Sequence, residues 1–216
     1  MRPMRVRRGA HGSMAGEAQR HVTRAELNAA LPDIMAAPKD AGHVEMLCLR
    51  PDYGQRRFVA QITVSARDGI PGERWATRPW LRDAAGNPHP GIQICILSRR
   101  VLDLVWRDRD TTVHPGDTFV TDLDLSQTNM PAGQRLEVGS AVLEVSDIFN
   151  DACVKWAARY GAGSRVWIND PAHRALRLRG ILCRIVQSGV IRAGDRVTKS
   201  PSIPSREGVD SPPAQG

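Results

Sequence analysis

The chain has 216 residues, a formal net charge of +7 at neutral pH and 41% hydrophobic residues. This composition is ordinary for a globular domain, and no apolar run reaches the ~18 residues that a membrane-spanning helix needs, so we expect no membrane association. The four cysteines are scattered along the chain rather than paired at short spacing. Free thiols of this kind favour a reducing compartment, which predicts a cytoplasmic location.

The positive charge is concentrated near the N-terminus, where residues 1–22 carry five arginines and one glutamate. We expect this arm, and the Pro/Ser-rich tail over residues 199–216, to be disordered. The body between them keeps a small positive charge, so no specific nucleic-acid binding is expected. The alternative is an RNA- or DNA-binding barrel driven by the arm, which deletion of residues 1–22 would weaken.

An N-terminal helix and linker are predicted over residues 23–43. Thr23-Arg-Ala-Glu26 is a capping box, and apolar residues follow it at helical spacing from Leu27 to Ile34. Pro32 interrupts this pattern and should kink or split the helix, because proline cannot donate the backbone hydrogen bond.

From residue 44 onward the hydrophobic period changes from 3.6 to 2, which indicates strands. Further helices are predicted over residues 99–107, 152–160 and 163–168. The predicted strands are 44–49, 59–65, 92–97, 118–125, 135–138, 141–146, 180–186 and 195–198. Many short strands with few helices predict a mainly β (α+β) fold, a β-barrel-like domain with flanking helices over residues 44–198.

Two local details follow from the alternation within strands. Gly139-Ser140 joins two alternating runs as a two-residue hairpin, which sets Arg135 opposite Glu144. In the run over residues 118–125, the apolar side chains share one face, so Asp122 and Asp124 should point to water.

Cys153 is the most informative residue of the chain. It stands where a strand and a polar turn give way to a short helix, and with Asp151 as N-cap it would occupy the first turn. Free backbone N–H groups there, with Lys155 and Arg159 nearby, favour the thiolate, while the Asp151 carboxylate opposes it. Thiolates attack electrophiles and bind soft metals, so Cys153 is either a reactive sulfur or a structural residue.

The other cysteines differ from Cys153, because Cys48, Cys95 and Cys183 lie inside apolar strand-like runs typical of core residues. The histidines show no metal-ligand spacing. The five tryptophans are interpreted as core or helix-packing residues.

Three polar residues are further candidates for binding. Arg74, in Gly69-Ile-Pro-Gly-Glu-Arg74, forms an anion clamp with Arg78 or Arg99, or the glycines serve turn geometry alone. Asn129 hydrogen-bonds a heterocycle edge or fixes a turn. Arg179 lies at the mouth of a strand, as a binding residue or as half of a salt bridge.

The chain resembles the MOSC domain, the C-terminal domain of molybdenum-cofactor sulfurases, over residues 44–198, and within that family a subgroup of small stand-alone bacterial proteins. Four motifs in matching order carry the resemblance: Gly69-Ile-Pro-Gly72-Glu-Arg, Pro131-Ala-Gly133-x-Arg-Leu-x-x-Gly139-x-Ala-Val-Leu-Glu-Val, the Cys153 helix, and Arg179-Gly180-Ile181 followed by Gly194-Asp195-x-Val197.

The resemblance implies a barrel-like fold and a pterin-based molybdenum cofactor. By position, Cys153 would be the persulfide carrier or the molybdenum ligand, and Arg74, Asn129 and Arg179 would surround the cofactor. The subgroup commonly has Pro-His-Thr-Gly before the cysteine, whereas this chain has Phe149-Asn150-Asp151-Ala152. The chain therefore lacks the histidine that would act as a base beside the sulfur.

Two functions remain open at this point. The first is sulfur transfer or molybdopterin-dependent reduction at Cys153, with a sulfur-donor or redox partner protein, because the chain has no pyridoxal-phosphate desulfurase domain. The second is a non-catalytic module that binds an anionic ligand or a partner, with a degenerate cysteine site.

Overall fold

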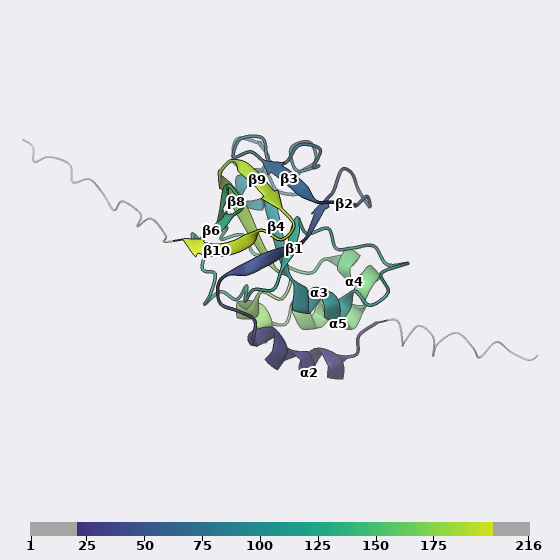
Figure 1. Ribbon diagram of the computed structural model, residues 1–216. Helices are drawn as coiled ribbons and strands as arrows, with labels where there is room; N and C mark the ends of the chain where they lie inside the picture. The colour runs from purple at the N-terminus through teal and green to yellow at the C-terminus, as the bar shows by residue number, and fades with distance from the viewer. Residues whose placement is uncertain (1–20, 201–216) are drawn as a thin grey trace, which may run out of the picture.

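The computed structural model describes residues 21–200 (Figure 1). Most of the expected disordered arm and most of the expected tail lie outside these residues. Lys199 and Ser200, which were assigned to the tail, belong to the last strand. The strands are β1 (Gly42–Leu49), β2 (Arg57–Val59), β3 (Gln61–Val64), β4 (Ile94–Ser98), β5 (Phe119–Thr121), β6 (Arg135–Val138), β7 (Ala141–Val145), β8 (Ile181–Gln187), β9 (Gly189–Arg192) and β10 (Arg196–Ser200).

Seven of these strands form a closed mixed barrel, which confirms the predicted fold class. Their order is β10-β6-β7-β8-β4-β5-β1, and pairing of β1 with β10 closes the ring. The β4–β5 pair is parallel and the other pairs are antiparallel. Strand β2 adds to β1 outside the ring, and β3 pairs with β9 as a separate ribbon.

The hairpin between β6 and β7 has the predicted register. Arg135 lies opposite Glu144, with an ion pair of 3.3 Å, and Leu136 lies opposite Leu143. Gly139 in the turn has φ +58°, and a Cβ there would lie 2.3 Å from the Val190 carbonyl oxygen. The turn therefore requires glycine for conformation and for space.

The helices pack together on one side of the barrel (Figure 1). They are α2 (Arg24–Met35), α3 (Arg99–Val105), α4 (Val154–Tyr160) and α5 (Ala162–Ile168), with 3-10 turns at Pro90–Ile92 and Pro171–Leu176. The capping box of α2 is present. Pro32 does not split α2. Proline lacks an N–H group, so only the Asn28 carbonyl loses its helical hydrogen bond, and Asn28 is exposed, so water can bind that carbonyl instead.

Several predicted details are wrong. The run over residues 59–65 is divided between β2 and β3, and the run over 118–125 is a strand only at β5. Asp122 does not point to water, because it pairs with Arg99 and Arg100, and Asp124 is buried against Lys39. Long-range ion pairs thus replace the expected alternation.

Other outcomes concern one additional strand and the tryptophans. Strand β9 was not predicted. Trp80 is exposed, whereas the other four tryptophans are buried as expected. Within residues 21–200, no helix is long and apolar enough to cross a membrane.

Candidate functional site

Cys153 is exposed at the start of α4, and the other three cysteines are buried, as predicted. It is itself the N-cap residue, with φ −83° and ψ 179°, so the prediction of Asp151 as N-cap is wrong. The cause is the preceding residue, Ala152, whose backbone N–H donates to Asn169 at 2.8 Å. Its carbonyl accepts from Asn169 and Arg165. These bonds hold residue 152 in the connection to α5 and delay the helix start to Val154.

An exposed tyrosine links the Cys153 helix to the predicted Arg74. The Tyr53 ring, in the connection from β1 to β2, lies 4.7 Å from Arg74 Cζ and 5.0 Å from Lys155 Nζ. Arg78 Cζ lies 5.9 Å from the same ring. The structure therefore brings Arg74, Arg78 and α4 to one face, whereas Arg99 instead pairs with acidic residues including Asp122.

Glu73 explains the geometry of the Gly-Ile-Pro-Gly-Glu-Arg turn. Its fully buried carboxylate accepts from the Arg50 backbone N–H at 3.2 Å, from Arg50 Nε at 3.1 Å and from the Arg74 backbone N–H at 3.0 Å. The turn is thereby fixed to the end of β1, with Arg74 directed outward. Arg50 was missed by the sequence analysis, since nothing local links it to a residue 23 positions away.

Arg56 is a second cation near this region that the sequence alone did not single out. Its Nε and Nη2 donate to the His114 and Pro115 carbonyl oxygens at 2.9 and 2.8 Å. Within residues 21–200 it has no carboxylate partner, and burial together with the nearby Arg159 lowers its pKa. Arg159 likewise has no ion-pair partner among the described residues. Two cations without a carboxylate partner among the described residues therefore lie in the same region.

Arg179 lies beneath α4 in a buried ion pair. Its Nη1 donates to Asp117 Oδ1 at 2.6 Å, and its Cζ lies 4.9 Å from the Trp156 ring centroid. Cys95 Sγ also donates to Asp117 Oδ1, at 3.0 Å. The pKa of Asp117 is lowered because the Arg179 charge and these hydrogen bonds outweigh burial. Asp117 Oδ2 has no hydrogen-bond partner among the described residues.

Asn129 makes its side-chain hydrogen bonds with other residues than Cys153, Arg74 and Arg179. Its Nδ2 donates to the carbonyl oxygens of Lys39 and Asp124 at 2.9 and 2.8 Å, and its Oδ1 accepts from Lys199 at 2.9 Å. It therefore fixes the turn after β5 against the linker and β10. This geometry matches the turn interpretation of Asn129, and its role toward a cofactor stays a prediction.

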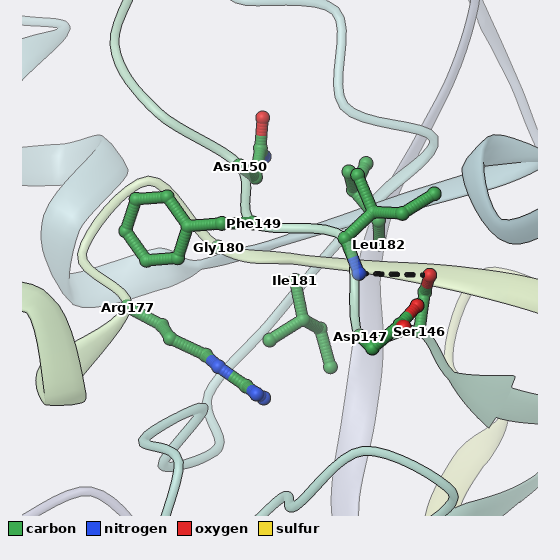
Figure 2. Close-up of a pocket in the computed structure, with 9 residues that line it drawn as sticks. Ser146, Asp147, Phe149, Asn150, Arg177, Gly180, Ile181 and Leu182 are labelled. Carbon is green, nitrogen blue, oxygen red and sulfur yellow. Dashed lines mark hydrogen bonds between the residues drawn. The ribbon is translucent and has the colours of Figure 1, made fainter. Parts of the chain in front are cut away.

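A small pocket lies beside the loop that leads to Cys153. Figure 2 shows that its lining comes from residues 146–150 and from residues 177–182 at the start of β8. Asn150 connects this loop to the Arg179 region, since its Nδ2 donates to the Arg179 carbonyl oxygen at 3.0 Å and lies 3.6 Å from Cys95 Sγ. Arg177, also in the lining, donates to the Met130 carbonyl oxygen. Cys153 and Arg74 do not line this pocket.

A metal site made entirely of protein side chains does not occur in the described part of the chain, where no three His, Cys, Asp or Glu residues are grouped to hold an ion.

Comparison with known proteins identifies the family. The MOSC-domain family model matches residues 87–198, more than half of the chain, and the protein belongs to this family. A crystal structure of a hypothetical protein is similar at 15% identity, with a TM-score of 0.53 and coverage of 74% of this chain and 69% of that one. This likeness supports the fold alone.

Two further solved structures have lower TM-scores. YuaD from Bacillus subtilis is 18% identical, with a TM-score of 0.49 over 73% of this chain and 94% of its own. YiiM from Escherichia coli is 16% identical, with a TM-score of 0.48 over 77% and 72%. A search among curated proteins finds no match.

Alkylation of the folded protein should distinguish Cys153 from the other thiols. Burial raises the pKa of Cys48 to about 11 and also raises the pKa values of Cys95 and Cys183, which suppresses their thiolates. An iodoacetamide time course at neutral pH, read by peptide mass spectrometry, should show Cys153 labelled at least about tenfold faster. Unfolding in guanidinium should equalise the four rates, and equal rates in the folded protein would contradict the prediction.

Proposed function

We propose that the protein binds a molybdenum cofactor or carries sulfur on Cys153, in sulfur transfer or molybdopterin-dependent reduction. The observation that carries this proposal is the exposure of one thiol out of four, at the start of α4 in a MOSC-family chain. Four free cysteines suit a reducing compartment, so we assign the activity to the cytoplasm.

Sulfur transfer requires only the Cys153 thiolate and a donor persulfide. The thiolate attacks the outer sulfur of the donor, a new S–S bond forms on Cys153, and the donor S–S bond breaks to leave the donor thiolate. The product is a Cys153 persulfide, and no external oxidant or reductant is consumed. Because the exposed Cys153 lies on the surface, a protein donor has access to it.

The residues present also fit the cofactor by donor type. A thiolate is a suitable soft ligand for molybdenum, which would supply redox chemistry when bound. Arg56 and Arg159, which lack carboxylate partners among residues 21–200, suit an anionic group of the cofactor. Arg179 supports α4 from beneath through Trp156 rather than facing outward. Arg74 lies over Tyr53, at the outer edge of this region.

Mass and elemental analysis of protein purified without oxygen tests the proposal. We expect stoichiometric molybdenum, or a sulfur adduct of about +32 Da on Cys153, and loss of either signal in Cys153→Ser. Cys183→Ala, which removes a buried thiol, is the matched control and should keep the signal. Absence of both signals from folded protein would contradict the proposal.

A second candidate is a non-catalytic module for an anionic ligand or a partner. Asn150 favours it, because Asn150 stands where the related subgroup has its histidine and commits its amide to the Arg179 carbonyl. An amide cannot take a proton from the thiol or from a substrate. Ligand binding that persists in Cys153→Ser, without any turnover by the wild type, would select this candidate.

A further inference from the structure

Three cations, Arg74, Arg78 and Lys155, surround the exposed ring of Tyr53. We name these four residues the Tyr53 patch. The tyrosine is 58% exposed. Arg78 pairs with Asp52, but within residues 21–200 neither Arg74 nor Lys155 has an ion-pair partner. The aromatic ring therefore holds two uncompensated cations at the surface, because its face attracts positive charge.

The surroundings of the patch are also positive. Arg57 is exposed, and its Nη2 lies 3.6 Å from the position of a Cβ on Gly72, in the turn before Arg74. Arg159 lies one helical turn after Lys155 and so shares its side of α4. Asp52 and Asp151 offset only part of this charge. A positive surface of this kind attracts a negatively charged partner at long range.

The position of the patch relates it to Cys153. Lys155 is two residues from Cys153 at the same helix end, so a protein large enough to cover that end can reach both residues. Tyrosine and arginine are the residue types enriched at the energetic centres of protein interfaces. The patch shares no residue with the pocket of Figure 2, and the high exposure of the Tyr53 ring makes it an open surface.

We propose that the Tyr53 patch is the docking surface for an acidic face of the protein that delivers sulfur or electrons to Cys153. This inference rests on the proposed function and assigns Arg74 to partner recognition. Docking on the patch brings the partner's reactive group beside the exposed thiol. Charge complementarity would make the encounter fast and strongly dependent on salt.

Fluorescence anisotropy with a labelled peptide of about twelve residues, rich in Glu and Asp, tests the docking surface. The full chain should bind it, with affinity falling between about 50 and about 200 mM salt. Arg74→Glu with Lys155→Glu should weaken binding at least about tenfold, and Tyr53→Ala should weaken it severalfold. Arg192 is the exposed last residue of β9, a strand that lies away from α4 in Figure 1, so Arg192→Glu is the matched control and should bind as the wild type does.

Three results would overturn the assignment. Equal weakening by Arg192→Glu would mean a non-specific attraction, and equal binding of a Gln/Asn version of the peptide would exclude charge recognition. Displacement of the peptide by inorganic phosphate, beyond the effect of chloride at equal ionic strength, would indicate a small-anion site instead. Peptide binding is measured with the Cys153 thiol reduced and without any adduct. Loss of peptide binding would therefore contradict the docking surface, whereas absence of the Cys153 adduct would contradict the proposed function.

Discussion

Replacing Arg179 with methionine should lower the free energy of unfolding by about 3–5 kcal/mol, because it leaves a buried carboxylate without its counter-ion. The Asp117 side chain is 0% exposed and that of Arg179 is 14% exposed. Methionine keeps much of the aliphatic length of arginine, so the loss reports mainly the charge rather than a cavity. Urea unfolding followed by circular dichroism measures the difference.

Two further variants make this result specific. Arg184→Met removes a salt bridge to Glu144 from the same strand region, but the Arg184 side chain is 51% exposed, so we expect a loss below about 1 kcal/mol. Arg179→Met combined with Asp117→Asn removes the unpaired charge as well, so the double variant should recover part of the stability. Equal losses for Arg179→Met and Arg184→Met would contradict a buried ion pair.

The same ion pair has a local consequence for the Cys153 region. Arg179 supports α4 through the Trp156 ring, and the Arg179 carbonyl holds Asn150 in the loop before Cys153. Arg179→Met should therefore loosen the start of α4 before the rest of the barrel. A larger increase in the hydrogen-exchange rate over wild type in residues 150–156 than in β7 would report this effect.

The features that the sequence predicted well depend on residues close together in the chain. The β6–β7 hairpin follows from alternation and a two-residue glycine turn, and its register was correct in every pair. The start of α2 follows from a box of four residues, Thr23 to Glu26. Hydrophobic period and turn chemistry act over a few residues, so both can be recognised without knowledge of the fold.

The candidate site was predicted less completely, because its organising contacts join distant residues. Asp117 and Arg179 are 62 positions apart, and Asn169 fixes Ala152 from 17 positions away. The second contact decides that Cys153, rather than Asp151, caps α4. Cys153 could be selected from its local setting, but its cap geometry and the cations around Tyr53 appear only once the barrel brings these segments together.

Acidification should destabilise the protein through His114, which is buried between the Trp106 and Phe58 rings. Burial lowers its pKa from 6.5 to about 4, and the Arg56 charge acts in the same direction against the opposing Asp117. Between these two pH values the unfolded chain binds more protons than the folded protein. The free energy of unfolding should therefore fall by about 3 kcal/mol as the pH is lowered from 6.5 to 4.

His114→Asn tests this assignment. The Nδ1 atom of His114 accepts the Gly116 backbone N–H at 3.0 Å, and an asparagine Oδ1 can take its place without a titratable proton. The difference in stability between wild type and variant should change with pH in that window, because the histidine contributes the slope. His43→Asn, at an exposed position of β1, is the control and should keep the wild-type slope. A slope retained in His114→Asn would assign the acid sensitivity to carboxylates elsewhere in the barrel.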